Sequence, residues 1–317
     1  MVNVANRIEV RRVRPGGADY VAAVHKALDL DVTPGATGMH PSAAAFVASA
    51  QRRLLKLELV FGAFEDGRIV GACLAVESPG SSAMVRATGA CASGPARHAT
   101  SAALEHLVAA ARSRGLRLLE ALIDPNDEAS ADALAGGGFS HLTRLIYMRR
   151  RANGPAAIPR AATDLDWVTY SGDTRPLFSA GIEASYAASL DCPEVAGVRS
   201  VRDVLDGHRA VGDFDPELWW VARRNSQPVG VLLVNSLPPT LVLEVVYMGV
   251  AQPARGTGVG DALLGRAVEA CRSRGMRGLA LAVDERNDAA RRLYARWGFV
   301  ETGVRSAWIA APGSAAD

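Results

Sequence analysis

The chain of 317 residues contains little lysine and no long hydrophobic run. Lys26 and Lys56 are its only lysines, so arginine supplies most of the 35 basic side chains; with 33 acidic ones they leave a formal net charge of +2. No block of like charge occurs, which argues against a nucleic-acid or anionic-membrane partner. Nowhere do about 18 apolar residues follow one another, and the N-terminus has no apolar stretch behind its charges. Neither a membrane span nor a secretion signal is therefore expected.

Cysteine is also scarce, with four residues at Cys73, Cys91, Cys192 and Cys271. They form no C-x-x-C pair and no histidine pair accompanies them, so the sequence predicts neither a metal site nor a disulfide framework. A reducing cytoplasm is the expected location. Small neutral molecules and acidic cofactors remain open as partners.

An internal repeat appears when the sequence is compared with itself. Residues 110–140 and 270–300 agree at 12 of 31 positions without a gap, including Asp124 with Asp284 and the Gly-Phe pair near the end of each segment. Strand-like runs precede and follow both copies, which indicates duplication of one α/β unit. With 317 residues and 49% hydrophobic side chains, the chain is long enough for two such domains.

The repeat predicts an N-terminal domain over residues 1–150, a linker over residues 151–164 and a C-terminal domain over residues 165–317. The linker contains two prolines and shows no periodicity. In the second copy, apolar runs and helical spacing predict strands at 218–223, 229–235, 241–250 and 279–283, and helices at 259–275 and 288–297. The predicted fold class is α/β (α+β), with a mixed sheet in each copy and helices packed on it.

A glycine-rich turn joins the third of these strands to the helix that follows it. Arg255, Gly256, Gly258 and Gly260 lie in this turn. Backbone N–H groups at a helix N-terminus bind phosphate oxygens, and glycine exposes them because it has no Cβ. The sequence lacks the Gly-Lys-Ser/Thr of a P-loop, and the G-x-G-x-G spacing differs from a dinucleotide fingerprint. A glycine-rich turn without a ligand is the alternative.

Two signatures in this copy resemble those of the GCN5-related N-acetyltransferase (GNAT) superfamily. Residues 255–260 read Arg-Gly-Thr-Gly-Val-Gly and match its acyl-CoA loop, Gln/Arg-x-x-Gly-x-Gly/Ala. Residues 287–299 run from Asn287 through Tyr294 to Phe299 and match its second signature, Asn-x-x-Ala-x-x-x-Tyr-x-x-x-Gly-Phe. The resemblance is sharpest from 218 to 308 and implies two tandem GNAT-type domains, each with a mostly antiparallel sheet flanked by helices.

The resemblance also implies how acetyl-CoA is bound, with no metal. The implied cofactor-binding residues are Met248, Gly249, Val250, Arg255, Gly256, Thr257, Gly258, Val259, Gly260 and Asn287. Backbone groups of the first three pair with the pantetheine arm and the acyl group, and the amides of the loop hold the pyrophosphate. Asn287 either contacts the cofactor arm or caps its own helix. The Tyr294 hydroxyl protonates the leaving thiolate, unless it is only a half-buried aromatic side chain.

Glu244 is the candidate general base. It interrupts an otherwise apolar strand, where an unpaired carboxylate is costly unless it is paired or faces a water-filled cleft. A carboxylate can take the proton that an attacking amine must lose, directly or through water. A salt bridge to an arginine of a neighbouring strand is the alternative.

The acceptor pocket is expected between two helices within residues 179–209. Tyr186, Asp191 and Glu194 are candidate substrate contacts, with residues 191–194 as the inter-helix loop; a solvated connection is the alternative. The tandem layout and the Glu-x-x-x-x-Gly-Val run at Glu244 resemble mycothiol synthases, which acylate a cysteinyl amine on a glucosaminyl-inositol. Asn235 is a further candidate contact, because it stands where a lysine is expected in that group. The resemblance therefore concerns architecture.

The N-terminal copy has lost the residues of the phosphate loop. At the repeat shift, the arginine and glycines of that loop are replaced by Pro95, Ala96, His98 and Thr100, and Tyr294 by Leu134. Side chains with a Cβ crowd such a turn and proline removes one N–H donor. The sequence predicts a monomeric or homodimeric acetyl-CoA-dependent N-acetyltransferase in which a small-molecule primary amine attacks directly in a ternary complex. A protein N-terminal or lysine acetyltransferase and a non-catalytic acyl-CoA-binding protein are the alternatives.

Overall fold

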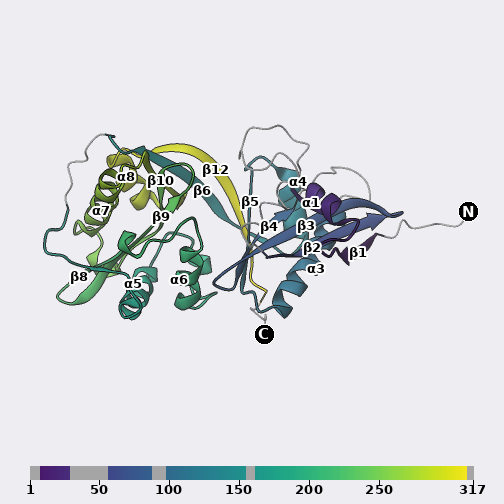
Figure 1. Ribbon diagram of the computed structural model, residues 1–317, viewed down its shortest axis with the longest axis horizontal. Helices are drawn as coiled ribbons and strands as arrows, with labels where there is room; N and C mark the ends of the chain where they lie inside the picture. The colour runs from purple at the N-terminus through teal and green to yellow at the C-terminus, as the bar shows by residue number, and fades with distance from the viewer. Residues whose placement is uncertain (1–7, 29–55, 88–97, 155–160, 313–317) are drawn as a thin grey trace, which may run out of the picture. The chain divides into compact units, whose positions relative to one another are not determined.

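The computed structural model describes residues 8–28, 56–87, 98–154 and 161–312. The chain divides into two compact units (Figure 1). One contains the described residues up to Leu142 together with those from Ser306 onward, and the other is Thr143–Arg305. Residues 155–160 of the predicted linker lie outside the described part of the chain.

Most of the last strand of the first repeat, and the end of the last strand of the second, belong to the unit that is built mainly from the other repeat. Strand β6 (Ser140–Arg151) ends the first repeat and pairs with β11 (Gly278–Asp284) in the second unit. The end of β12 (Val300–Ala310) pairs with β5 (Leu118–Ile123) in the first unit. Repeats and compact units therefore coincide except at these final strands.

The first unit is a mixed sheet with helices on both faces. Its other elements are β1 (Glu9–Arg12), α1 (Tyr20–Leu28), β2 (Lys56–Glu65), β3 (Arg68–Ser78), β4 (Ser82–Ala87), α3 (Ala99–Ser113) and α4 (Glu128–Gly136). The strands follow the order β1-β2-β3-β4-β5-β12, and only β4 and β5 pair in parallel. Successive residues of β2 face opposite sides, so Val60 packs with α1 and Phe61 packs with α3.

The second unit repeats this arrangement. Its other elements are β7 (Asp166–Thr169), α5 (Arg175–Tyr186), α6 (Val201–Arg209), β8 (Trp219–Arg224), β9 (Gln227–Leu237), β10 (Val242–Val250), α7 (Val259–Ser273), α8 (Asp288–Arg296) and the short 3-10 helices Pro193–Val195, Pro216–Leu218 and Gln252–Ala254. The strands follow the order β6-β11-β10-β9-β8-β7, with β10 and β11 parallel. The mixed, mostly antiparallel sheet flanked by helices confirms the predicted fold class.

Two apolar clusters cover the faces of the second sheet. Leu263 of α7 and Tyr294 of α8 belong to a cluster with Leu232 on one face. Phe178 of α5 packs with Trp219 on the other face, which α6 also covers. Figure 1 shows α7 and α8 on the opposite side of this sheet from α5 and α6. None of the helices in the described part of the chain is long and apolar enough to cross a membrane.

Strands β10 and β11 separate part of the way along their length. Their parallel pairing runs only from Val242 with Gly278 to Glu244 with Ala280. Beyond that point β10 continues to Val250 and, among the described strands, pairs with β9 alone, with an irregularity in register between Val245 and Tyr247. The edge of β10 that faces β11 is therefore open in its second half.

Candidate active site

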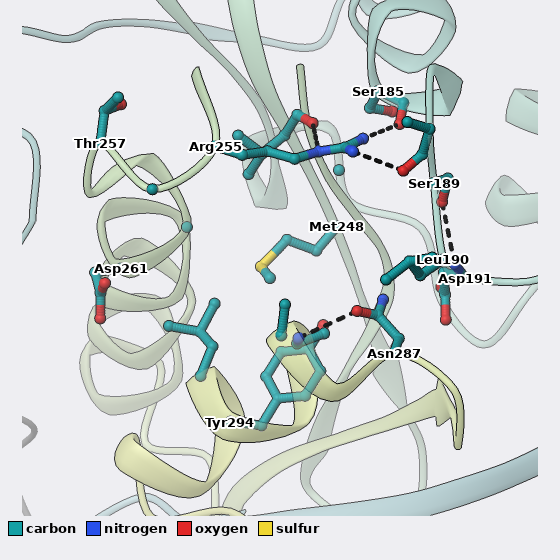
Figure 2. A pocket seen from close by; sticks show the side chains of 18 of the residues that line it. Ser185, Ser189, Leu190, Asp191, Met248, Arg255, Thr257, Asp261, Asn287 and Tyr294 are labelled. Atoms are coloured by element: carbon teal, nitrogen blue, oxygen red, sulfur yellow. Dashed lines mark hydrogen bonds between the residues drawn. The ribbon is translucent and has the colours of Figure 1, made fainter. Parts of the chain in front are cut away.

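A cavity of about 850 Å³ lies at the open edge of β10. Its walls are the end of α5 with the loop that follows, the end of β10, the glycine-rich turn with the start of α7, and α8 (Figure 2). The lining residues are Ser185, Tyr186, Ala188, Ser189, Leu190, Asp191, Tyr247, Met248, Gly249, Val250, Arg255, Gly256, Thr257, Gly258, Gly260, Asp261, Asn287, Ala289, Ala290, Leu293, Tyr294 and Arg296. All of them belong to the second unit.

The glycine-rich turn presents a row of uncommitted backbone donors to this cavity. The N–H groups of Gly256, Gly258, Val259 and Gly260 have no acceptor among the described residues. Gly258 has φ +86° and precedes the first residue of α7, a left-handed conformation that a side chain with a Cβ adopts with strain. The Val259 side chain points into the apolar core, so only its backbone can serve a ligand. The turn can bind an anion through its amides and the helix dipole.

Arg255 lines the cavity, yet its guanidinium is committed to the protein. It donates to the carbonyl oxygens of Ser185 at 2.9 Å, Ala187 at 2.8 Å and Ala188 at 2.7 Å, and to that of Val250 at 3.2 Å. Figure 2 shows the side chain spanning the cavity wall toward Ser185. Arg255 therefore holds the C-terminal end of α5 against the glycine-rich turn, which the signature spacing alone does not predict.

The end of β10 forms the floor between these elements. Met248, Gly249 and Val250 pair with β9 on one side and line the cavity. A Cβ on Gly249 would lie 2.4 Å from Ser185 Oγ, so glycine permits the close approach of α5. The Tyr247 hydroxyl lies 2.5 Å from the same Ser185 Oγ. Helix α5 is thus fastened to β10 as well as to Arg255.

Tyr294 projects from α8 into the cavity (Figure 2). The residue is 6% exposed, and among the described residues its hydroxyl has no hydrogen-bond partner. Burial raises the pKa of Tyr294 above its ordinary value, and the nearby Asp191 carboxylate raises it further. The phenol therefore keeps its proton near neutral pH and has a free O–H to donate.

Glu244 stands where β10 and β11 separate. It lies opposite Asn235 of β9 and Ala280 of β11, and it is half-buried. No described arginine pairs with it, so the predicted alternative of a cross-strand salt bridge does not occur within the described chain. Burial raises its pKa above the ordinary range for glutamate. Glu244 is not among the residues that line the cavity.

The structure separates the four candidate acceptor contacts into two pairs. Tyr186 and Asp191 line the cavity, whereas Glu194 and Asn235 do not. Glu194 is exposed and forms an ion pair with Arg286 at 2.6 Å. Asn235 is fully buried: its amide accepts from the Trp219 indole at 2.8 Å and donates to two backbone carbonyls. The amide of Asn235 has no free group for a substrate.

Asn287 caps its own helix at the edge of the cavity. Its Oδ1 accepts from the Ala290 N–H at 3.2 Å, one of the two alternatives that the sequence leaves open. The side chain lines the cavity as well, and a hydrogen bond from it lowers the pKa of Asp191, whose enclosure raises it. The Asn287 amide nitrogen therefore points to the cavity side of the cap.

Asp284 organises the loop beside the cavity, and sequence reasoning did not identify this role. Its carboxylate is completely buried and accepts from Thr143 Oγ1 at 2.7 Å, from the Cys192 N–H at 3.0 Å and from Arg286 at 2.7 Å. Although burial raises the pKa of Asp284, these hydrogen bonds lower it to about 2. The sequence did show an aspartate at the same position of both repeats, Asp124 and Asp284, which could have pointed to this role. The Asp124 carboxylate, however, is exposed and, in the described part of the chain, accepts only from the Asn126 N–H.

The equivalent turn of the N-terminal copy differs in the part that the structure describes. His98 is exposed at the start of α3, and Thr100 is buried in its first turn. Pro95 and Ala96 lie outside the described residues. No group of three or more His, Cys, Asp or Glu side chains among the described residues is placed to hold a metal ion.

Comparison with known proteins agrees with this geometry. The family model described as "Acetyltransferase (GNAT) family" matches residues 187–299, which include the cavity loop, the glycine-rich turn and α8. The mycothiol acetyltransferase of Thermobispora bispora is 31% identical over 211 residues, which cover 61% of this chain and 70% of that protein. The chain belongs to the GNAT acetyltransferase family.

Other relatives match a smaller share of their own length. The mycothiol acetyltransferase of Frankia alni is 32% identical over 58% of this chain and 60% of its own length. That of Beutenbergia cavernae is 34% identical over 29% of this chain and 32% of its own length. The chain therefore aligns with about a third to two thirds of these relatives.

Solved structures of GNAT proteins share the fold along nearly the whole chain. A GCN5-related N-acetyltransferase from Sphaerobacter thermophilus superposes with a TM-score of 0.58 at 18% identity, covering 98% of this chain and 97% of that one. A tandem GNAT protein of the clavulanic acid biosynthesis pathway superposes with a TM-score of 0.51 at 17% identity, covering 98% and 100%. At these identities the likeness concerns the fold alone.

Proposed function

We propose that the protein transfers an acetyl group from acetyl-CoA to a primary amine of a small molecule. One observation carries the proposal: a single cavity brings together the uncommitted N–H groups of Gly256, Gly258, Val259 and Gly260 and the Tyr294 hydroxyl, which has no partner among the described residues. The first fits the pyrophosphate of a CoA thioester and the second fits a proton donor to its sulfur. The alternative, a glycine-rich turn that binds no ligand, does not explain why the Tyr294 hydroxyl faces the same cavity.

The residues present fit acetyl-CoA as the acyl donor. The amides of Gly256, Gly258, Val259 and Gly260 would hold the pyrophosphate. The open edge of Met248, Gly249 and Val250 offers backbone groups to an extended arm, much as a strand is added to a sheet. Arg255 contributes by fastening α5, and Thr257 and Asn287 contribute side chains to the wall. No metal ion is part of the proposal.

Glu244 and Tyr294 would move the protons of the reaction. An amine attacks the thioester carbonyl only in its neutral form, and its remaining proton must leave as the tetrahedral intermediate collapses. Glu244 would accept that proton through a water molecule, because its side chain lies outside the cavity lining. The Tyr294 hydroxyl would donate a proton to the sulfur as the C–S bond breaks. The acetyl group would thus pass to the amine in one ternary complex.

Tyr186 and Asp191 are the proposed acceptor contacts. Both line the cavity, and the carboxylate of Asp191 favours an ammonium group over an anion. Asn235 and Glu194 are left out, because neither side chain lines the cavity. The names of the relatives make mycothiol-related amines the first acceptors to test. We assign the chemistry to the C-terminal domain of a cytoplasmic monomer or homodimer, with a degenerate N-terminal domain.

Release of CoA thiol tests the function directly. The protein is incubated with acetyl-CoA, a thiol reagent and a panel of mycothiol-related amines, simple amines and lysine peptides. Amine-dependent release that Tyr294→Phe reduces is expected. Release with peptides alone would favour a protein acetyltransferase. Tight CoA binding without release of CoA thiol for any amine would favour a non-catalytic binding protein and would contradict the catalytic proposal.

A further inference from the structure

An arginine outside both signatures reaches the glycine-rich turn from the neighbouring hairpin. Arg224, the last residue of β8, donates from one terminal nitrogen to Thr257 Oγ1 at 3.3 Å. Its other two nitrogens bind the carboxylate of Asp164 at 2.8 and 2.9 Å. This bidentate pair fixes the plane of the guanidinium, so the nitrogen on its far edge faces the turn.

The turn needs a cation that its own signature does not supply. Backbone amides offer partial charges only, whereas a diphosphate carries full negative charges. The guanidinium of Arg255 is turned toward four carbonyl oxygens of the protein. Asp261, in the first turn of α7, adds a negative charge. Its carboxylate forms an ion pair with the Arg296 guanidinium at 3.3 Å and accepts a hydrogen bond from the Trp297 indole. Arg224 is the arginine whose guanidinium bonds to the turn at Thr257, and its charge is paired with Asp164, which lies outside the turn.

The segment that carries Asp164 is itself fixed to the turn. The Ala162 N–H donates to the Gly258 carbonyl at 3.1 Å, and Leu165 packs against the apolar core of this unit. Asp164 is 63% exposed at its side chain, whereas Arg224 is 26% exposed. Within this pair, Arg224 is the more buried partner and contacts the turn, whereas Asp164 faces the solvent.

On the basis of the proposed function, we propose that Arg224 is a phosphate-binding residue for the acyl-CoA donor, positioned by Asp164 beside the amides of the glycine-rich turn. The Thr257 hydroxyl donates to the Ala254 carbonyl at 2.8 Å, so its oxygen accepts from Arg224 and holds the guanidinium next to Thr257, a residue of the cavity wall. An arginine forms two parallel bonds to a phosphate, which a lysine cannot reproduce. The pyrophosphate is the expected target because Thr257 lies within the turn.

Calorimetry with Arg224→Gln tests the assignment. The Kd of CoA is expected to rise about tenfold, which corresponds to about 1.4 kcal/mol, and to rise less in Arg224→Lys. Turnover with acetyl-pantetheine, which has no phosphate, should stay at the wild-type value. Arg274→Gln is the matched control: Arg274 pairs with Asp215 and Glu217 at the other end of α7 and should leave the Kd unchanged.

The cofactor fragments decide which phosphate is bound. A tenfold loss that persists with 3′-dephospho-CoA identifies the pyrophosphate, and a loss that disappears identifies the 3′-phosphate; both support the assignment. Wild-type affinity for CoA in folded Arg224→Gln would overturn it. So would an equal loss of turnover with acetyl-pantetheine, because Arg224 would then act on the fold. If the wild-type protein bound no CoA, the proposed function itself would fall together with this inference.

Discussion

The backbone N–H of Asp284 donates to the carboxylate of Asp191 at 3.0 Å, although the two residues are 93 positions apart. In return, the Asp284 carboxylate accepts from the N–H of Cys192 at 3.0 Å. These two bonds join the loop after α5 to the end of β11, beside the cavity. Arg286 extends the connection, because it binds Asp284 and Glu194 together. The loop that carries the proposed acceptor contact Asp191 is therefore held by a buried charge.

Substitution of Asp284 should lower the free energy of unfolding at neutral pH. It should also make that free energy less sensitive to a fall in pH. Asp284→Asn keeps the shape and loses the ion pair with Arg286, which we expect to cost about 2 kcal/mol of the free energy of unfolding at neutral pH. The folded-state pKa of about 2 lies below the ordinary value of 3.8. This contribution is therefore present above pH 4 and lost as the pH falls toward 2.

Chemical denaturation at several pH values measures this difference. The gap between wild type and Asp284→Asn should shrink as the pH is lowered from about 4 to 2. Asp124→Asn is the control, because the equivalent carboxylate of the N-terminal copy is exposed and accepts from a single N–H. A gap that stayed constant with pH would show that the charge of Asp284 does not contribute.

A carboxylate placed in the glycine-rich turn should abolish cofactor binding. Gly260→Glu brings a Cβ to 3.0 Å from the tip of Leu293, a flexible side chain that can shift, so the fold should survive. The added charge would face the phosphates, and we expect the Kd of CoA to rise at least about a hundredfold, or about 2.7 kcal/mol. Calorimetry measures the affinity and circular dichroism the fold.

The degenerate copy supplies the control for this substitution. His98→Glu introduces the same charge at the start of α3, where the side chain is exposed. It should leave the affinity for CoA unchanged. Equal losses in both variants would mean that the N-terminal copy also binds the cofactor, contrary to the sequence prediction.

Glu244→Gln should lower activity and raise stability. Turnover is expected to fall about a hundredfold if Glu244 acts as the general base, with CoA affinity unchanged. Its raised pKa means that the folded state binds the proton more tightly than the unfolded state. The carboxylate therefore destabilises the fold increasingly as the pH rises from about 4.5 through the raised pKa, and glutamine removes that cost.

Thermal unfolding and initial rates separate the two effects of this variant. The Tm of Glu244→Gln should exceed that of the wild type at pH 7 and approach it below pH 4.5. The acidic limb of the wild-type pH-rate profile should disappear in the residual activity of the variant. Unchanged turnover would assign the proton transfer to another group.

Local sequence patterns predicted most of the second unit but missed contacts between distant segments. Strands β9 and β10 and helix α8 followed from apolar runs and from the cap at Asn287. Strand β12 spans Val300–Ala310, and its first four residues are exposed, so they lack the apolar alternation that would mark the start of the strand in the sequence. The contact between Asp191 and Asp284 depends on where a loop meets a strand end, which no local pattern records.

The site residues also divide into those that local spacing predicted correctly and those whose contacts join distant segments. The spacing within one turn and one helix brought Tyr294, Asn287 and residues 255–260 to a single cavity, apart from the buried side chain of Val259. Asn235 was inferred from its position in the resemblance to mycothiol synthases, and the sequence could not show that the Trp219 indole occupies its amide. Arg224 was missed because its relation to Thr257 spans 33 positions between a hairpin and a turn.

Tyr294→Phe isolates the leaving-group half of the proposed reaction. The ring packs 5.7 Å from that of Phe299, measured between ring centroids, and phenylalanine keeps this contact while removing the hydroxyl. Because the hydroxyl has no partner among the described residues, its loss leaves no buried donor or acceptor unpaired, and stability should change little.

Turnover of Tyr294→Phe should fall about a hundredfold, with the Kd of acetyl-CoA unchanged, because the sulfur needs a proton only as the C–S bond breaks. A parallel loss of affinity and turnover would make Tyr294 a packing residue of the cofactor site. An acyl donor with a more acidic thiol provides a second test: its leaving group needs less protonation, so the gap between wild type and variant should narrow. If the gap stayed equally wide with such a donor, the hydroxyl would act by orienting the thioester and not by donating a proton.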